Sequence, residues 1–190
     1  MTDLQPPGAG IPKIEMVIGK GILSLKSMLS SDEKALRVFE LEMNTLINLH
    51  DHVDLVAADE QVLIGRMAGL EDSSRNWSLF MVLEHLCIVN REMLKVVDAL
   101  KRGIVPRGEI AIEYYKPDPD VDTDVIERFK DCCYDFLEVL RAHGRLRTRL
   151  TYSHPWFGEL DGHGWAVLAA MHMGLHRRQA QRIIAKQGVV

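Results

Sequence analysis

The chain has 190 residues, of which 47% are hydrophobic and 26% charged, and its net charge is −4 at pH 7. This size and balance predict one soluble domain with a sizeable core. The slight acidic excess argues against a nucleic-acid partner, and charges interrupt every apolar run before it is long enough to span a membrane. The N-terminus, MTDLQPPGAG, lacks the form of a signal peptide, so we expect a cytoplasmic protein.

Three cysteines are present, Cys87, Cys132 and Cys133. Adjacent cysteines on a helix point about 100° apart and do not bridge easily, and no Cys-x-x-Cys spacing occurs. We therefore expect buried, free thiols rather than disulfides or a redox site.

Residues 1–30 are predicted to be a lead-in followed by an accessory helix. The first twelve residues are rich in proline and glycine, whereas apolar side chains recur at helical spacing over residues 12–29. Gly19 and Gly21 weaken this helix. It could lie on the outside of a bundle or form a dimer contact.

A second helix is predicted to begin at residues 30–32, where two serines and an aspartate offer an N-cap. The helical pattern continues as far as Met67, with an interruption near residues 57–59. His50, His52 and Asp54 gather late in this pattern. They are typical of a capping or solvated cluster, and the alternative is that one of them reaches a metal.

The next helix is predicted to follow a loop at residues 68–76. Ser78 is its expected N-cap, and it ends near Gly103. His85 lies two turns into this helix, on an apolar face. A histidine in such a place is more often a hydrogen-bonded core residue than a ligand, so the position alone does not predict a metal site.

Residues 104–122 contain three prolines and several charges, which predicts a long surface connection. A further helix is expected to start at residues 122–124, with an inward stripe that extends to Leu150. After a loop at residues 151–164, in which Asp161 can act as a cap, the last helix runs to residues 186–188. No pattern of strand length stands out. The prediction is an all-α fold: a four-helix bundle over residues 31–190 with an additional N-terminal helix.

The last helix carries the pair His172 and His176 in WAVLAAMHMGLHRRQ. Residues four apart lie on one helix face, one turn apart, and the neighbouring apolar side chains turn this face inward. Two imidazoles could share a metal ion, but a divalent metal such as zinc usually takes three or four protein ligands. His85 is the candidate for the third.

Several known helical metal sites do not fit the sequence. The paired Glu-x-x-His motifs of ferritin-like di-iron proteins and the His-Glu-x-x-His motif of zincins are both absent. A hemerythrin-like di-iron site would depend on His50 and Asp54, which is weak support.

Three segments, WSLFMVLEHL, HPWFGELDGHGW and AAMHMGLHRRQAQRI, together resemble the DinB/YfiT-like superfamily of small metal-binding four-helix bundles. The resemblance covers residues 31–186. It implies that His85, His172 and His176 bind a divalent metal. It also implies that Gln179 packs or makes a hydrogen bond to a ligand. His154 is expected to line the site entrance or to have a structural role beside Pro155.

Imidazole ligands suit zinc, nickel, iron and copper alike, and we expect zinc or nickel first, with iron and copper as alternatives. The resemblance further implies a metal-dependent enzyme on a small molecule, either a hydrolase or a thiol S-transferase that uses a low-molecular-weight thiol, and a homodimer. No catalytic side chain can be named. The alternative is a non-catalytic, stress-related bundle with a structural metal or a small-ligand site. A fourth ligand from Asp54 or Glu92 would favour that alternative.

Overall fold

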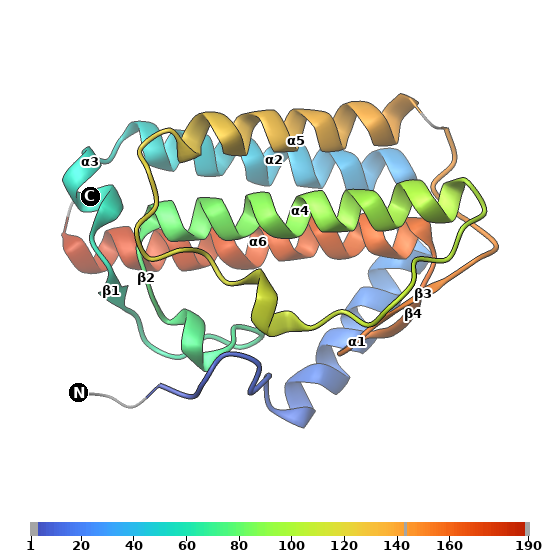
Figure 1. The fold of residues 1–190 in the computed structure, drawn as a ribbon, viewed down its shortest axis with the longest axis horizontal. Helices are drawn as coiled ribbons and strands as arrows, with labels where there is room; N and C mark the ends of the chain where they lie inside the picture. The colour runs from blue at the N-terminus through green and yellow to red at the C-terminus, as the bar shows by residue number, and fades with distance from the viewer. Residues whose placement is uncertain (1–3, 143, 189–190) are drawn as a thin grey trace.

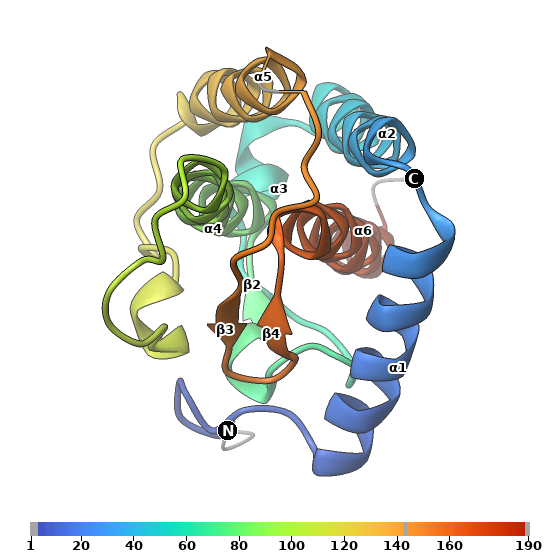
Figure 2. The ribbon, with the colours of Figure 1, turned by 90° about the vertical axis from the view of Figure 1, so that its right-hand side faces the viewer.

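Four long helices form the body of the molecule in the computed structural model, which describes residues 4–142 and 144–188 (Figure 1). Seen nearly end-on, α5 and α2 make one layer and α4 and α6 the other (Figure 2). The predicted fold class, an all-α four-helix bundle with an additional N-terminal helix, is confirmed. The helices are α1 (Lys13–Leu29), α2 (Asp32–Asp51), α4 (Leu79–Lys101), α5 (Val125–Ala142) and α6 (Gly162–Gln187), with a short α3 (Leu55–Asp59).

Side-chain caps fix the start of three bundle helices. The side chain of Ser31 accepts a hydrogen bond from the backbone N–H of Lys34 at the start of α2. Ser78 does the same for α4 and Asp161 for α6. Each cap satisfies a backbone donor that has no partner within its helix. The three predicted caps are therefore confirmed.

The direction of the helices explains the long connection between α4 and α5. Both helices run the same way along the bundle, so residues 102–124 must return along the whole length of α4 (Figure 1). This connection contains the 3-10 turn η2 (Ile112–Tyr115) and passes over the face of α4 that points away from α5 (Figure 2). Its course decides what covers the candidate site described below.

The core lies between the two helical layers. Phe39 of α2 stacks on Phe136 of α5 with ring centroids 4.4 Å apart, and both side chains are fully buried. The cysteines Cys87, Cys132 and Cys133 lie in this core as free thiols, as predicted. Burial of the apolar side chains of this core as a whole supplies most of the driving force for folding.

The second helix is shorter than predicted. It ends at Asp51, and the break falls at residues 52–54 rather than at residues 57–59. His52 turns its Nδ1 to the carbonyl oxygen of Asn48, and Asp54 caps the short α3. Polar side chains that bind nearby backbone groups compete with helix continuation in this way. The expected capping role is therefore confirmed for His52 and Asp54, whereas His50 lies beside Asp51.

Two short antiparallel ladders were not predicted. Strand β1 (Val62–Leu63) pairs with β2 (Asn76–Trp77), and β3 (Tyr152–His154) pairs with β4 (Gly158–Leu160). Strands of two or three residues are too short to produce a recognisable alternation. The fifth helix also ends earlier than expected, at Ala142, although Leu146 beyond it is buried.

Helix α1 lies outside the bundle and contacts α6 along one side (Figure 2). Its one buried side chain is Leu23, and its C-terminal end is held by His163, which hydrogen-bonds to the carbonyl of Ser27 and to Asp32. None of the described helices is long and apolar enough to cross a membrane. Seven apolar side chains of α1 remain exposed: Ile14, Val17, Ile18, Ile22, Leu25, Met28 and Leu29.

A matched pair of glycine substitutions tests the close approach at the start of α6. A Cβ at Gly162 would lie 2.5 Å from the carbonyl oxygen of Leu146, which is backbone and cannot move cheaply. We expect Gly162→Ala to lower the free energy of unfolding by about 1–3 kcal/mol. Gly21→Ala, where nothing lies within 4 Å of the added atom, should raise it by about 0.5–1 kcal/mol. Urea unfolding followed by circular dichroism measures both free energies. Equal effects of the two substitutions would contradict the close approach of Gly162 to the backbone of Leu146.

Candidate metal centre

Three histidines from two helices meet on one side of the bundle. His85 comes from the second turn of α4, and His172 and His176 come from the middle of α6. Each offers a ring nitrogen, and these three atoms lie within 4.8 Å of one another. The Nε2 atoms of His85 and His172 are 3.3 Å apart. Nitrogens bound to one tetrahedral metal at about 2.0–2.1 Å are separated by about 3.3–3.4 Å, so the spacing of this pair fits a shared ion.

Hydrogen bonds fix the tautomers of two of these histidines. The Nδ1 of His85 lies 2.6 Å from the carbonyl oxygen of Tyr115, which can only accept, so Nδ1 carries the proton. The Nδ1 of His176 lies 2.7 Å from Oε1 of Gln179, whose Nε2 donates to the carbonyl of Ser74 and thereby fixes the amide orientation. Both imidazoles therefore present an unprotonated Nε2 to the centre, as a metal ligand must.

His172 is held differently. Its Nδ1 is buried and has no hydrogen-bond partner within residues 4–142 and 144–188. Without a metal, this ring can carry its proton on Nε2 and donate it to the Nε2 of His85. Among the described residues, the contact with His85 favours a proton on Nε2 of His172, so this proton must leave Nε2 before that nitrogen can bind a metal.

Burial keeps the three rings neutral. It lowers the pKa of His85 to about 4 and the pKa values of His172 and His176 well below the usual value. Charge on a neighbouring ring would lower the pKa of the latter two further. A neutral imidazole is the form that binds metal, so these groups need not lose a proton near neutral pH.

Trp77 and a buried ion pair support the centre from one side. The indole of Trp77 stacks on His176 with centroids 5.9 Å apart and lies 5.0 Å from His85. The ammonium of Lys116 lies 5.5 Å from the Trp77 ring and pairs with Glu71. Burial opposes ionisation of Glu71, but hydrogen bonds from Lys116, the Gly10 backbone and Ser73 outweigh it and lower its pKa.

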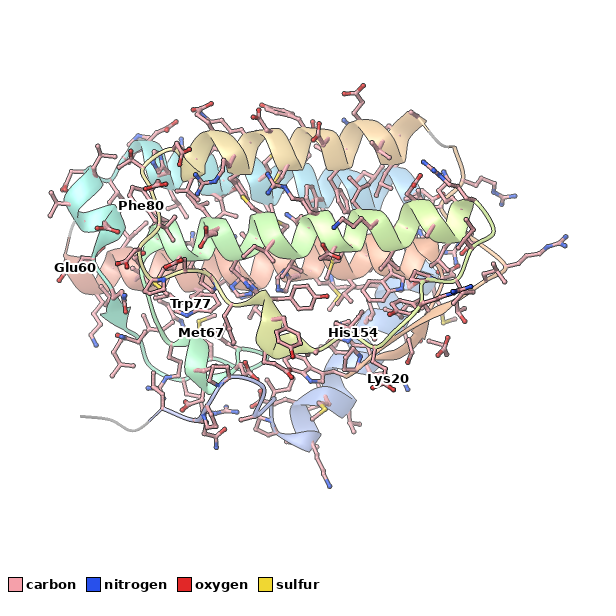
Figure 3. All side chains as sticks on the ribbon, viewed as in Figure 1. Lys20, Glu60, Met67, Trp77, Phe80 and His154 are labelled. Atoms are coloured by element: carbon pink, nitrogen blue, oxygen red, sulfur yellow. The ribbon has the colours of Figure 1, made fainter. Side chains whose placement is uncertain are left out.

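The histidines form part of the wall of a pocket of about 730 Å³. The pocket lies on the α4–α6 side of the bundle, between α1, the β3–β4 hairpin and the connection that contains η2. Figure 3 labels Trp77 and His154, which lie on this side. His154 lines the pocket, which agrees with one of its two expected roles, and burial lowers its pKa to about 4. A small molecule could therefore reach the histidines.

The other candidate ligands are engaged elsewhere. Asp54 caps α3, Glu92 pairs with Lys95 at 2.6 Å, and His50 lies beside Asp51. Within the described part of the chain, the three histidines are the only group of three or more metal-binding side chains. No fourth protein ligand is present in that group.

The comparisons with known proteins agree with this architecture. The sequence pattern of the DinB superfamily matches residues 25–180. The chain belongs to the DinB superfamily. Among solved structures this DinB-superfamily chain is similar to TT2238, whose crystal structure is described as a four-helix bundle protein. The two share 22% identity over 80% of this chain and 98% of that chain, with a TM-score of 0.59, which shows a common fold. The chain matches no curated protein.

Some residues of the site were not visible in the sequence. Tyr115 contributes a backbone carbonyl from a loop 30 residues away from His85, and no sequence pattern marks such a contact. Trp77 lies just before the cap of α4 and covers two of the histidines, which no local pattern indicates. The expected hydrogen bond between Gln179 and a candidate ligand is present, with Nδ1 of His176 donating to Oε1 of Gln179.

The orientation of His176 can be tested through Gln179. We expect Gln179→Leu to weaken zinc binding by about 10–100-fold, because the Nδ1 proton of His176 loses its acceptor. Gln181→Leu is the control, since Gln181 bonds to Arg177 on the exposed side of α6. Competition with a chromophoric chelator measures both affinities. Equal zinc affinities in the two variants would show that Gln179 does not orient the ligand.

Proposed function

We propose that this DinB-superfamily protein is a metal-dependent enzyme on small molecules, of the thiol S-transferase or hydrolase type. His85, His172 and His176 would hold a divalent metal, zinc or nickel in the first place and iron or copper as alternatives. The observation that carries the proposal is the arrangement of the three ring nitrogens around one point in the wall of a large pocket.

A divalent metal bound by three neutral imidazoles keeps its full charge and lowers the pKa of a water or thiol that it binds. The residues of the chain supply the rest. Tyr115 and Gln179 hold two imidazoles in the ligating tautomer, and Trp77 limits the movement of both rings. The pocket gives a substrate room to approach while its apolar walls exclude bulk water.

The alternative is a metal that only stabilises the bundle. A structural site is normally closed by a fourth protein ligand, whereas a catalytic site keeps a position open. Asp54, one candidate for a fourth ligand, caps α3, and among the described residues the group of metal-binding side chains contains only the three histidines. A position left open to a water or substrate supports the catalytic proposal over the structural one.

The exposed apolar face of α1 supports a second copy of the chain as partner. Seven exposed apolar side chains on one helix form a patch that is unusual on a monomer. Two-fold dimers are the commonest oligomers, and in such a dimer this patch would face its own copy.

We expect the wild-type chain to be a dimer and the double variant Val17→Lys, Leu25→Lys to be a monomer, because four buried ammonium groups would oppose association. Light scattering after size-exclusion chromatography measures the mass. Tyr134→Lys, at an exposed position of α5, is the control and should leave the dimer intact. A wild-type monomer, or a dimer that survives the double variant, would contradict this partner.

The metal centre is tested by metal content. We expect about one metal per chain in untagged wild-type protein and less than a tenth of that in His176→Ala. His52→Ala is the control, because this histidine caps α2 away from the centre and its loss should not change the metal content. Elemental analysis measures all three proteins. A wild type that stays metal-free after reconstitution with zinc and nickel would overturn the proposal.

The reaction is tested on the same fully metallated proteins. Glutathione or cysteine with an electrophile such as monobromobimane measures thiol transfer, and p-nitrophenyl esters measure hydrolysis. We expect activity in one assay that His176→Ala abolishes and His52→Ala retains. A metallated wild type without activity in either assay would favour the structural metal.

A further inference from the structure

The pocket extends well beyond the histidines, and most of its wall is apolar. Helices α4 and α6 contribute Val89, Met93, Leu168 and Met171, among others. The volume of about 730 Å³ is within the range of sites that enclose small organic ligands. The three histidines thus occupy one part of this pocket, a chamber that can hold a much larger molecule than water.

Several charged side chains line the chamber, and the less exposed ones among them pair with side chains of opposite charge. Glu15 pairs with Arg66 and accepts from the Gly69 backbone, and Glu71 pairs with Lys116. Glu92 likewise pairs with Lys95, while Arg107, Glu109 and Arg178 are exposed. Away from Arg107, Glu109 and Arg178, which lie where water reaches them, a charged ligand would lose its hydration without gaining an unpaired partner of opposite charge.

His154 provides a polar group with a fixed direction of hydrogen bonding. Its Nδ1 accepts a hydrogen bond from the backbone N–H of Trp156 at 3.1 Å, so in the neutral ring Nε2 carries the proton. The ring packs against Phe157 and Trp165, with centroids 4.8 and 5.5 Å away. His154 lines the pocket, and no hydrogen bond to its Nε2 is found within residues 4–142 and 144–188, so this N–H is available to a ligand that reaches the ring.

The N-terminal segment forms one wall of the chamber. Ile11, Ile18 and Ile22 line it, and a Cβ at Gly19 would lie 3.2 Å from the ring of Phe157 in the β3–β4 hairpin. Most of α1 precedes residue 25, where the match to the DinB superfamily begins. Most of this wall therefore lies outside the segment that matches the family.

We propose that the chamber binds an uncharged, mostly apolar molecule with one hydrogen-bond acceptor, such as the carbonyl of a ketone, ester or amide, and that His154 positions that acceptor. Any reaction at that carbonyl rests on the proposed function, in which the three histidines of the same chamber hold a metal. Binding itself does not depend on a metal, so the two proposals can fail separately.

Binding is tested on metal-free protein with N-phenyl-1-naphthylamine, a neutral apolar fluorophore. We expect about one site per chain, with affinity at least tenfold lower in Val89→Trp, whose indole would fill the chamber. Val38→Trp, at an exposed position of α2, is the control and should bind as the wild type does. Met171→Trp fills the chamber from α6 and replaces Val89→Trp if circular dichroism shows that the latter is unfolded. Affinity that neither filling variant reduces would overturn the proposal.

Competition against the fluorophore tests the ligand class with three molecules of similar size: hexanophenone, hexylbenzene and 4-pentylbenzoate. We expect His154→Phe to weaken hexanophenone about fivefold and to leave hexylbenzene unchanged, since only the ketone loses a hydrogen bond. The anionic 4-pentylbenzoate should bind at least tenfold more weakly than hexanophenone. Tighter binding of the anion, or equal effects of His154→Phe on ketone and hydrocarbon, would overturn the assignment. A protein that binds metal but not the fluorophore would lose this inference and keep the metal centre.

Discussion

The hydrogen bond from Nδ1 of His85 to the carbonyl oxygen of Tyr115 connects the topology of the bundle to the chemistry of its site. A neutral imidazole has one proton, so the group that binds Nδ1 decides whether Nε2 can act as a ligand. Tyr115 is there because α4 and α5 run in the same direction and residues 102–124 must pass back along α4. The parallel direction of α4 and α5 therefore requires the long loop, and the loop holds His85 in the tautomer that can bind a metal.

The same arrangement explains why the site lies on the α4–α6 side. The opposite side of this layer packs against α2 and α5 and is filled by large apolar side chains such as Phe39 and Phe136. On the site side, only α1, a hairpin and loops cover the helices (Figure 2). Loops and a single slanted helix do not fill space as a second helical layer does. The incomplete cover leaves a chamber, and buried polar rings are tolerated at its wall because hydrogen bonds satisfy most of them.

Local signals predicted the bundle and brought the three histidines to attention. Helical periodicity and the caps Ser31, Ser78 and Asp161 placed the helices, and the spacing of His172 and His176 placed two rings on one face. The family resemblance was needed to favour His85 as a ligand, because its position on an apolar face is typical of a core histidine. The short strands, the Tyr115 carbonyl and the place of α1 in the pocket wall depend on contacts between distant residues. No periodicity along the chain records such contacts.

Glu71 joins three parts of the chain that are far apart in sequence. Its carboxylate is 4% exposed and binds the Gly10 backbone, Ser73 and Lys116, which belong to the lead-in, the turn before α4 and the connection after it. If one of these segments moved away alone, a buried charge would lose part of its compensation. The three segments are therefore expected to loosen together rather than one by one.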